Sequence, residues 1–306
     1  MKEATELLKQ GRSDEVWSRY CGFLDLDVEK YMEIQARLLE EQLQLVSRSE
    51  LGRSLLGDNP PRNVDEFRSQ MRLTTYEDYA THLDEQREDV LVEKPVAWAH
   101  TSGRSGRYKW VPFTARAYTK IGVGALTALI LAQARRRGEM RLEPNNILVW
   151  NLASRPYISG YTALSLSESF DLRYVPSVEE MEKLGFRERI QASFQIGLRT
   201  GIDFIGSIGS VLVKIGEEFS NGAAGKGISP AMLHPAVAFR LGRGLLRSRL
   251  AGRPLLPKDL WQVKAVIVSG TDTDIYRPQL VEYWGVEPRE IYGCTETGAV
   301  MSVQAW

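Results

Sequence analysis

The chain has 306 residues, enough to bury a sizeable core in one large domain or two modest ones. Hydrophobic residues make up 43% and charged residues 25% of it, which is typical of a soluble globular protein. The 39 basic and 39 acidic side chains cancel. This balance excludes the strong overall charge that attracts nucleic acid or anionic lipid. We therefore predict no nucleic-acid or membrane partner, and any anionic ligand requires a local site.

The cysteines and the N-terminus favour a cytoplasmic protein. Cys21 and Cys294 are far apart, without metal-ligand spacing, and suit a reducing compartment. The first residues lack the apolar segment of a secretory signal. The longest apolar stretch, 121–134, is shorter than the ~20 residues of a membrane span, so we expect a buried helix there.

The first ninety residues are predicted to be helical. Apolar residues recur at helical spacing over 28–46, with Asp25 and Asp27 as candidate N-caps. The Gly-Asp-Asn-Pro-Pro cluster at 57–61 breaks this pattern. We assign 1–90 to a helical N-terminal segment.

Residues 91–306 alternate between short β-branched runs and longer amphipathic ones. Strands are predicted at 96–99, 147–152, 172–175, 263–268 and 290–292. Helices are predicted at 115–136, 161–169, 179–199, 209–219, 235–250 and 275–284. This alternation predicts an α/β fold with layered, mostly parallel sheets flanked by helices. Ligands of such sheets bind beyond the carboxyl ends of the strands, so the loops there are the candidate sites.

The loop after the first strand has the composition of a phosphate-binding loop. It contains Gly103 and Gly106 together with hydroxyl residues and cations, which are Thr101, Ser102, Arg104, Ser105, Arg107 and Lys109. Glycines let backbone N–H groups turn inward, hydroxyls add donors, and cations offset phosphate charge. A flexible basic surface turn is the alternative. The spacing is not that of a Walker loop, and Gly122 and Gly124 are interpreted as helix-packing positions.

The loop after strand 290–292 suits a nucleotide and a metal. Tyr292 can stack on a base, Gly293 turns the chain, Thr295 can bond a phosphate oxygen, and Glu296 can hold magnesium. Alternatively, Tyr292 is a core aromatic and Glu296 a solvated carboxylate. If both loops converge at one sheet edge, they supply the donors and the metal that nucleotidyl transfer requires.

These two segments resemble signature motifs of the adenylate-forming superfamily of acyl-CoA synthetases, luciferases and peptide-synthetase adenylation domains. Residues 101–109, Thr-Ser-Gly-Arg-Ser-Gly-Arg-Tyr-Lys, resemble its phosphate loop Thr-Ser-Gly-Thr-Thr-Gly-x-Pro-Lys. Residues 292–296, Tyr-Gly-Cys-Thr-Glu, fit its Tyr-Gly-x-Thr-Glu. Segments 74–79, 109–114, 149–152 and 156–160 are similar to the auxin- and jasmonate-conjugating acyl-acid amido synthetases and their bacterial relatives.

The resemblance implies a role for each matching residue. Thr101 through Gly106 and Lys109 would bind ATP phosphates, and Ser269, Gly270 and Thr271 would form a turn against the adenine and the acyl group. Tyr292 and Gly293 would contact adenine, Thr295 the α-phosphate, and Glu296 magnesium. Lys109, Thr295 and Glu296 are the expected catalytic residues. Tyr157 and Gly160 are weaker candidates for the acyl pocket wall, with a structural role as the alternative.

The sequence also departs from the family pattern. Arg104 replaces a hydroxyl residue, Tyr108 a proline, and Thr271-Asp272 the usual Gly-Glu. The family's ribose-binding aspartate and its small C-terminal domain with a catalytic lysine lie beyond the second motif. We therefore expect the chain to be an N-terminal portion of an adenylation domain, with the small domain absent.

The implied function is that of a ligase. A small carboxylic acid would be activated with ATP and magnesium as an acyl-adenylate and passed to an amino acid as an amide or to CoA as a thioester. The alternative is a degenerate AMP- or ATP-binding module without turnover, because the lysine domain is missing. A structural α/β protein with chance motifs is a third hypothesis.

Overall fold

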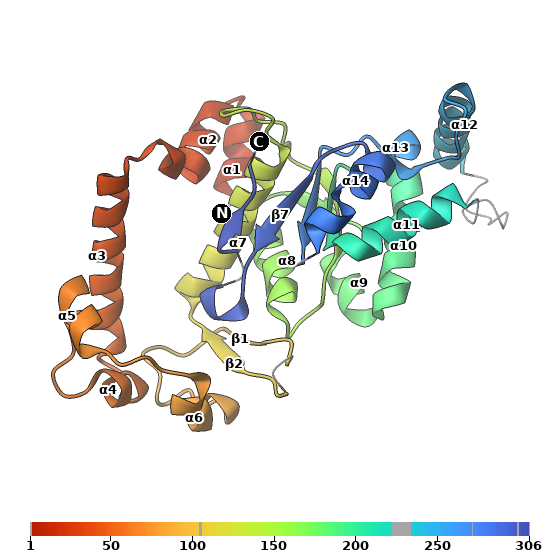
Figure 1. Cartoon of the computed structure of the whole chain (residues 1–306). Helices are drawn as coiled ribbons and strands as arrows, with labels where there is room; N and C mark the ends of the chain where they lie inside the picture. Colours follow the sequence, from red (N-terminus) through yellow and green to blue (C-terminus); the bar gives the residue numbers. More distant parts are fainter. Residues whose placement is uncertain (1, 104–105, 222–233, 271, 299, 306) are drawn as a thin grey trace.

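The computed structural model describes residues 2–103, 106–221, 234–270, 272–298 and 300–305. Its centre is a six-stranded sheet with the order β4-β3-β5-β6-β7-β8 (Figure 1). The strands are β3 (Asn146–Asn151), β4 (Leu172–Tyr174), β5 (Phe204–Ile208), β6 (Ala265–Ser269), β7 (Pro288–Tyr292) and β8 (Ser302–Val303). Neighbouring strands are parallel except β8, which runs antiparallel to β7. The predicted mostly parallel α/β sheet is confirmed.

Helices cover both faces of this sheet. Because side chains alternate along a strand, Leu148 and Phe204 share a cluster with α7 and α8, while Val149 and Ile205 share another with α11 and α14. The helices of this part are α7 (Ala115–Gln133), α8 (Ile158–Ser169), α9 (Val178–Lys183), α10 (Phe186–Thr200), α11 (Gly209–Ser220), α12 (Pro235–Leu250), α13 (Pro257–Leu260) and α14 (Thr273–Trp284). The result is a three-layer arrangement.

A two-stranded antiparallel hairpin, β1 (Ala97–His100) and β2 (Trp110–Phe113), lies below the large sheet (Figure 1). The backbone N–H of His100 donates to the carbonyl oxygen of Pro156 at 3.0 Å, in the segment that follows β3. The hairpin is thereby attached at the carboxyl ends of the parallel strands, where ligands of such folds bind.

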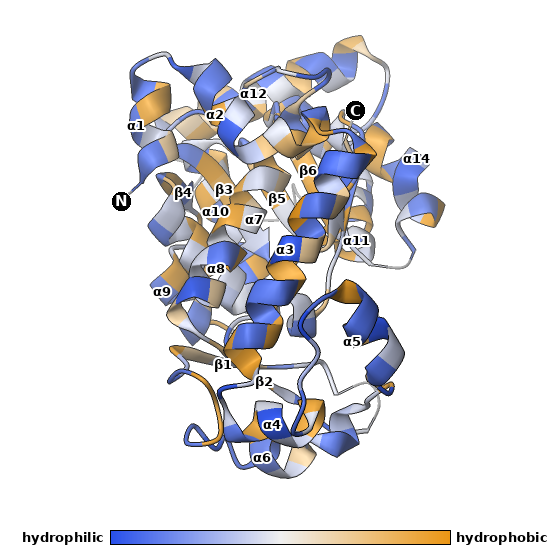
Figure 2. Cartoon of the chain, turned by 90° about the vertical axis from the view of Figure 1, so that its left-hand side faces the viewer, coloured by the Kyte–Doolittle hydropathy of each residue, from blue (hydrophilic) through white to orange (hydrophobic). Residues whose placement is uncertain are grey.

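The N-terminal part is helical, as predicted. Its helices are α1 (Glu3–Lys9), α2 (Ser13–Cys21), α3 (Val28–Val46), α4 (Glu50–Leu56), α5 (Val64–Gln70) and α6 (Ala80–Asp84), with the 3-10 helices η1 (Gly22–Asp25) and η2 (Tyr76–Asp78). The side chain of Asp27 accepts from the N–H of Lys30 at 2.7 Å and caps α3. In Figure 2, α4 and α6 lie beneath the β1–β2 hairpin.

The structure differs from the sequence prediction at one helix and two strands. The single helix expected at 179–199 is divided into α9 and α10, because Gly185 begins a new helix and its N–H donates to Glu188 at 2.9 Å. The central strand β5 was not predicted. Its sequence includes Gly206, where a Cβ atom would lie 2.8 Å from the Trp150 ring, so packing rather than β-propensity selects the residue. The short strand β2 was also missed, since Pro112 lies within it.

Among the helices that the structure describes, α7 is the one that is long and apolar enough to cross a membrane. Half of its most apolar window is buried inside the protein, in the same cluster as α8 and the sheet. This is the burial expected of a core helix. A Cβ atom on Gly122 would lie 2.5 Å from the carbonyl oxygen of Ser165, which confirms a packing role, whereas nothing lies within 4 Å at Gly124 and its predicted role is wrong.

Candidate active site

The expected phosphate loop connects β1 to β2. The N–H of Thr101 donates to the carbonyl of Lys109 at 3.0 Å, and the N–H of Lys109 donates to the Thr101 hydroxyl at 3.2 Å. Gly103 and Gly106 have φ of 70° and 103°, and the Gly106 N–H donates to the Gly103 carbonyl at 2.9 Å. These left-handed conformations explain why both positions are glycine. Ser102 is exposed, and Arg104 and Ser105 lie outside the described residues.

An aromatic cluster supports this loop. A Cβ atom on Gly103 would meet the Tyr108 ring at 3.0 Å, and the Tyr108 ring lies 4.5 Å from the His100 ring. His100 also contacts Tyr157, with ring centroids 4.4 Å apart, and its Nδ1 lies 2.8 Å from the Thr101 carbonyl oxygen. Tyr108, which departs from the family pattern, therefore covers the loop glycine, and His100 is a structural neighbour of the loop.

The cations of the loop differ in availability. Arg107 lies 3.0 Å from a Glu77 oxygen and 3.6 Å from an Asp84 oxygen, so two carboxylates already neutralise it. The Nζ atom of Lys109 lies 5.7 Å from the centre of the Tyr76 ring and forms no ion pair within the described chain. Of the two loop cations that the structure describes, Lys109 is consequently the one that is available to a phosphate.

The second loop follows β7. Tyr292 is 63% exposed, so its ring is not a core aromatic. Thr295 is buried in the 3-10 helix η5 (Thr295–Thr297), whereas the carboxylate of Glu296 is exposed and forms no hydrogen bond or ion pair with a described residue. A Cβ atom on Gly298 would lie 3.6 Å from Ile121, so the turn packs against α7. This leaves Glu296 free to bind a cation.

The two loops approach the same pair of tyrosines. The rings of Tyr76 and Tyr79 are 5.5 Å apart, and Lys109 lies over Tyr76. Burial raises the pKa of Tyr79, and the nearby negative charge of Glu296 raises it further. Lys109 and Glu296 therefore both lie in the neighbourhood of this pair of tyrosines.

A third turn follows β6. Ser269 ends the strand, and Gly270 has a φ of 155°. Thr271 lies outside the described residues. Ser269 faces the turn after β7, because it lines one cavity together with Gly293.

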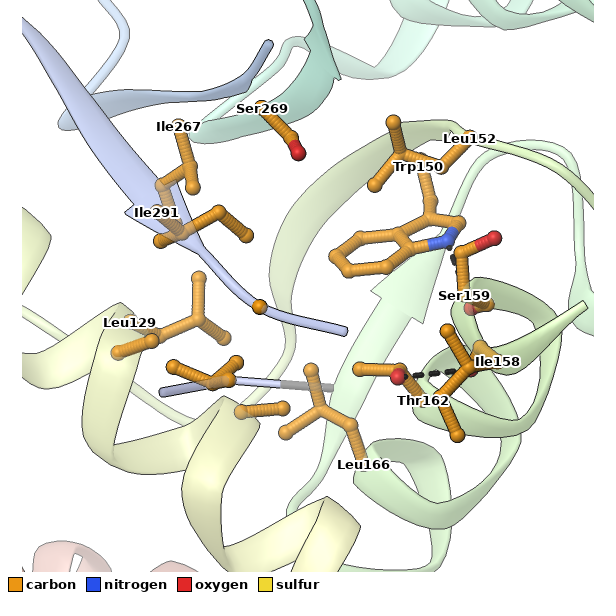
Figure 3. Close-up of a pocket in the computed structure, with 14 residues that line it drawn as sticks. Leu129, Trp150, Leu152, Ile158, Ser159, Thr162, Leu166, Ile267, Ser269 and Ile291 are labelled. Atoms are coloured by element: carbon orange, nitrogen blue, oxygen red, sulfur yellow. Dashed lines mark hydrogen bonds between the residues drawn. The ribbon is translucent and has the colours of Figure 1, made fainter. Parts of the chain in front are cut away.

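That cavity has a volume of ≈110 Å³ and lies between α7, α8 and the ends of β3, β6 and β7 (Figure 3). Its lining residues are Ala125, Ala128, Leu129, Trp150, Leu152, Ile158, Ser159, Thr162, Leu166, Ile267, Ser269, Ile291, Gly293 and Val300. Most of these side chains are aliphatic. The cavity is smaller than the roughly 150 Å³ space that holds benzene in an engineered protein core, which suits a small apolar group.

Two polar side chains in the wall of this cavity form hydrogen bonds within the protein. Trp150 Nε1 donates to the Ser159 carbonyl at 3.2 Å, and the Thr162 hydroxyl donates to the Ile158 carbonyl at 2.8 Å (Figure 3). The Trp150 ring rests against Gly206 on its other side. The ring orientation is therefore determined by both contacts.

Sequence reasoning missed most of this wall. Tyr157 and Gly160, the suggested wall residues, do not line the cavity, whereas Ile158 and Ser159 do. A Cβ atom on Gly160 would lie 2.1 Å from the Arg155 nitrogen, so this glycine has a packing role. Two features of the sequence could have indicated the wall: Trp150 at the end of an apolar strand, and the small residues on the side of α7 that faces it.

The residues of this site can hold a magnesium ion only if a bound nucleotide supplies further ligands. Glu296 offers one free carboxylate, and no group of three or more histidine, cysteine or acidic residues that could hold a metal occurs in the described part of the chain. Magnesium commonly binds through one or two carboxylates plus substrate phosphates. Glu296 would hold the ion that the phosphates bring with them.

Two solved structures share this fold. Both are of 2-hydroxyisobutyryl-CoA ligase in complex with 2-HIB-AMP and CoA, one in an open conformation and one in the thioesterification state. The TM-scores are 0.57 and 0.59, at 11% and 10% identity, and the matches cover 87% and 92% of this chain. They cover 51% and 52% of those proteins, so the chain spans about half their length. The chain therefore shares the fold of about half of this ligase.

A comparison of the sequence with family models gives a match over part of the chain. Residues 21–170 match the family model described as the GH3 family N-terminal domain. The match covers just under half of the chain and agrees with the resemblance of its motifs to the acyl-acid amido synthetases. No curated protein matches the chain.

Proposed function

We propose that this chain is the nucleotide- and acyl-binding part of a ligase that activates a small apolar carboxylic acid with ATP. The observation that carries the proposal is the apolar cavity, because Ser269 and Gly293 on its rim belong to the turns expected to contact the nucleotide. An acyl chain in this cavity would direct its carboxylate toward those turns.

The reaction consists of one displacement at phosphorus. A carboxylate oxygen of the acid attacks the α-phosphorus, and the bond from this phosphorus to the oxygen bridging to the β-phosphate breaks. Pyrophosphate leaves with the electron pair, and the acyl-adenylate remains. No general base is needed, because a carboxylic acid is already ionised at neutral pH.

The residues of the chain would position and stabilise this displacement. The exposed Tyr292 ring can stack on adenine, Thr295 can donate to the α-phosphate, and the backbone of the 101–109 loop with Lys109 can hold the outer phosphates. Magnesium at Glu296 would neutralise charge that develops on the phosphate oxygens.

The second half-reaction would pass the acyl group to an amine or a thiol. The GH3 family match favours an amino acid and an amide product. The CoA in the two structural relatives favours a thioester. We favour the amide, since the family match rests on sequence and the structural likeness on fold alone.

The substitution Glu296→Ala tests the magnesium role. Acid-dependent exchange of labelled pyrophosphate into ATP is expected to fall about 10²-fold, because developing charge loses its metal. Glu218→Ala, which removes an exposed carboxylate on α11, is the matched control and should leave exchange unchanged. Equal exchange by both variants would remove Glu296 from the mechanism.

The unmodified chain separates the two functional hypotheses. Exchange with any small apolar acid supports activation. ATP-dependent thermal stabilisation without exchange supports a binding module, and the absence of both contradicts a nucleotide site.

A further inference from the structure

Helix α12 has a stripe of exposed apolar side chains. Phe239 is 72% exposed, Leu246 59% and Leu250 80%. Residues seven and four positions apart lie on the same face of a helix, so these three side chains form one row, here called the α12 stripe. In Figure 1, α12 stands at the edge of the molecule. Single exposed leucines need no explanation, whereas a continuous row indicates an interaction surface.

Contacts with the rest of the protein determine which face of α12 points outward. Its buried residues include Val237 and Gly244, on the side opposite the stripe. A Cβ atom on Gly244 would lie 2.7 Å from the Leu260 side chain of α13. Arg240 donates from Nε to the Leu198 carbonyl of α10 at 3.0 Å and from Nη1 to the Leu260 carbonyl at 3.2 Å. The helix therefore cannot turn its stripe inward without losing these contacts.

Arginines flank the stripe on both sides. By helical geometry, Arg243 and Arg247 follow one edge of it and Arg249 lies at the other. None of the three forms an ion pair with a described residue, and Arg243 and Arg247 each lie 3.2 Å from the neutral side-chain amide of Gln262. Helix α12 contains no acidic residue, and the next one along the chain, Asp259, is paired with another arginine. The positive charge around the stripe is therefore not neutralised by these groups.

We propose that α12 docks the protein on an anionic lipid bilayer, with the helix axis in the plane of the interface. The stripe enters the boundary between headgroups and acyl chains, and the arginines reach the negative headgroups. With 16 residues and four arginines, the helix is too short and too polar to cross the bilayer. The zero net charge predicts no membrane partner for the chain as a whole, whereas α12 concentrates positive charge locally. This inference does not depend on the proposed adenylation.

Other partners complement this surface less well. Nucleic acid supplies negative charge but no apolar phase for Phe239 and Leu246. A second copy of the chain, packed symmetrically on the stripe, would bring like-charged arginines against one another. A bilayer with anionic headgroups supplies both the negative charge and the apolar phase.

Co-sedimentation of the chain with lipid vesicles tests the proposal. Vesicles of phosphatidylcholine with about 30% phosphatidylserine are compared with vesicles of phosphatidylcholine alone. The chain should sediment with the anionic vesicles and much less with the neutral ones, and added salt should release it because the charges are screened. Equal binding to both vesicles, or no binding to the anionic ones, would overturn the proposal.

The triple substitution Arg243→Gln, Arg247→Gln and Arg249→Gln should weaken binding to the anionic vesicles about 10²-fold. The matched control replaces three exposed arginines elsewhere by glutamine, which are Arg48, Arg68 and Arg187. The control removes the same net charge and should keep the binding. Equal losses in the two triple variants would show that total charge, and not α12, determines binding.

The apolar stripe is tested separately from the charge. Phe239→Ser combined with Leu246→Ser should weaken vesicle binding at least about tenfold, because two apolar side chains no longer enter the bilayer. Ile275→Ser, at a 76% exposed residue of α14, is the control and should bind like the parent protein. Loss of binding in the arginine variant but not in the serine variant would indicate an anionic partner without an apolar phase, such as nucleic acid, and would overturn the bilayer assignment.

Gly242→Leu provides a test that misfolding cannot imitate. Gly242 lies in α12 between Phe239 and Leu246, and nothing lies within 4 Å of a Cβ atom at this position. The new side chain widens the stripe, so vesicle binding should tighten several-fold. Unchanged or weaker binding would contradict insertion of the stripe. Self-association of the parent chain that Leu246→Ser abolishes would assign the stripe to a second copy instead.

Discussion

Tyr76 connects the helical N-terminal part to the phosphate loop. Its hydroxyl donates to Asp84 at 2.6 Å and accepts from the backbone N–H of Trp110, in β2, at 2.9 Å. Its ring lies beneath both Arg107 and Lys109. One side chain thus orients the hairpin and the cation that the proposed function assigns to phosphate.

Tyr76→Phe should destabilise the protein by about 1–3 kcal/mol, because the partly buried Trp110 N–H loses its acceptor. Denaturant unfolding measures this difference. Tyr79→Phe is the control, since the Tyr79 hydroxyl forms no hydrogen bond with a described residue. Equal effects of the two substitutions would contradict an anchoring role for the Tyr76 hydroxyl.

The contribution of Tyr76 to the free energy of unfolding should also depend on pH. Burial and the hydrogen bond to Asp84 raise the pKa of Tyr76 to about 12, above the value near 10 of an unfolded chain. A raised folded-state pKa stabilises the protein fully below about pH 10, and this contribution is lost as the pH rises through 12. The stability difference between the parent protein and Tyr76→Phe should therefore shrink above pH 10. A difference that stays constant to pH 12 would exclude this linkage.

At the scale of elements, the contact between α7 and α8 forms one side of the apolar cavity. Gly122 lets the helices approach, since a Cβ atom there would lie 2.5 Å from the Ser165 backbone oxygen and 2.6 Å from its hydroxyl. The Ser165 hydroxyl donates to the Tyr118 carbonyl of α7 at 2.8 Å. Close approach of the backbones thus positions the helices that line the cavity.

The two glycines of α7 provide a matched pair. Gly122→Ala should destabilise the protein by about 1–3 kcal/mol through overpacking. Gly124→Ala meets open space and should stabilise it by about 0.5–1 kcal/mol through helix propensity. Chemical denaturation of both variants is the measurement, and a stabilising Gly122→Ala would contradict the close approach.

For the whole molecule, the first two helices belong to the main core. Leu7, Val16 and Trp17 share a buried cluster with α7 and α8. The N–H of Asp171, between α8 and β4, donates to the Thr5 hydroxyl at 2.9 Å, and Lys2 forms an ion pair with the Asp171 carboxylate at 2.7 Å. The proposed division at residue 90 therefore separates helical from α/β sequence but does not separate two cores.

Removal of residues 1–90 should expose the face of α7 that α1 and α2 cover. We expect the fragment 91–306 to be insoluble or to lack a cooperative unfolding transition. In the intact chain, Trp17→Ala should cost about 3–5 kcal/mol and Phe23→Ala, at a 45% exposed residue, much less. A fragment 91–306 that unfolds cooperatively would show that the α/β part folds alone.

The sequence by itself determined the alternation of helices and strands, the N-cap at Asp27 and the two loops around Gly103 and Glu296. Each of these depends on local spacing, turn chemistry or backbone conformation, which neighbouring residues specify. The tertiary structure decided the rest. It made the glycine-containing segment 204–208 a central strand, divided 179–199 at Gly185, and placed Trp150 and Ile158 in one apolar wall. It also buried Arg189 beside Ser154. These features arise from contacts between residues distant in sequence, which no local pattern encodes.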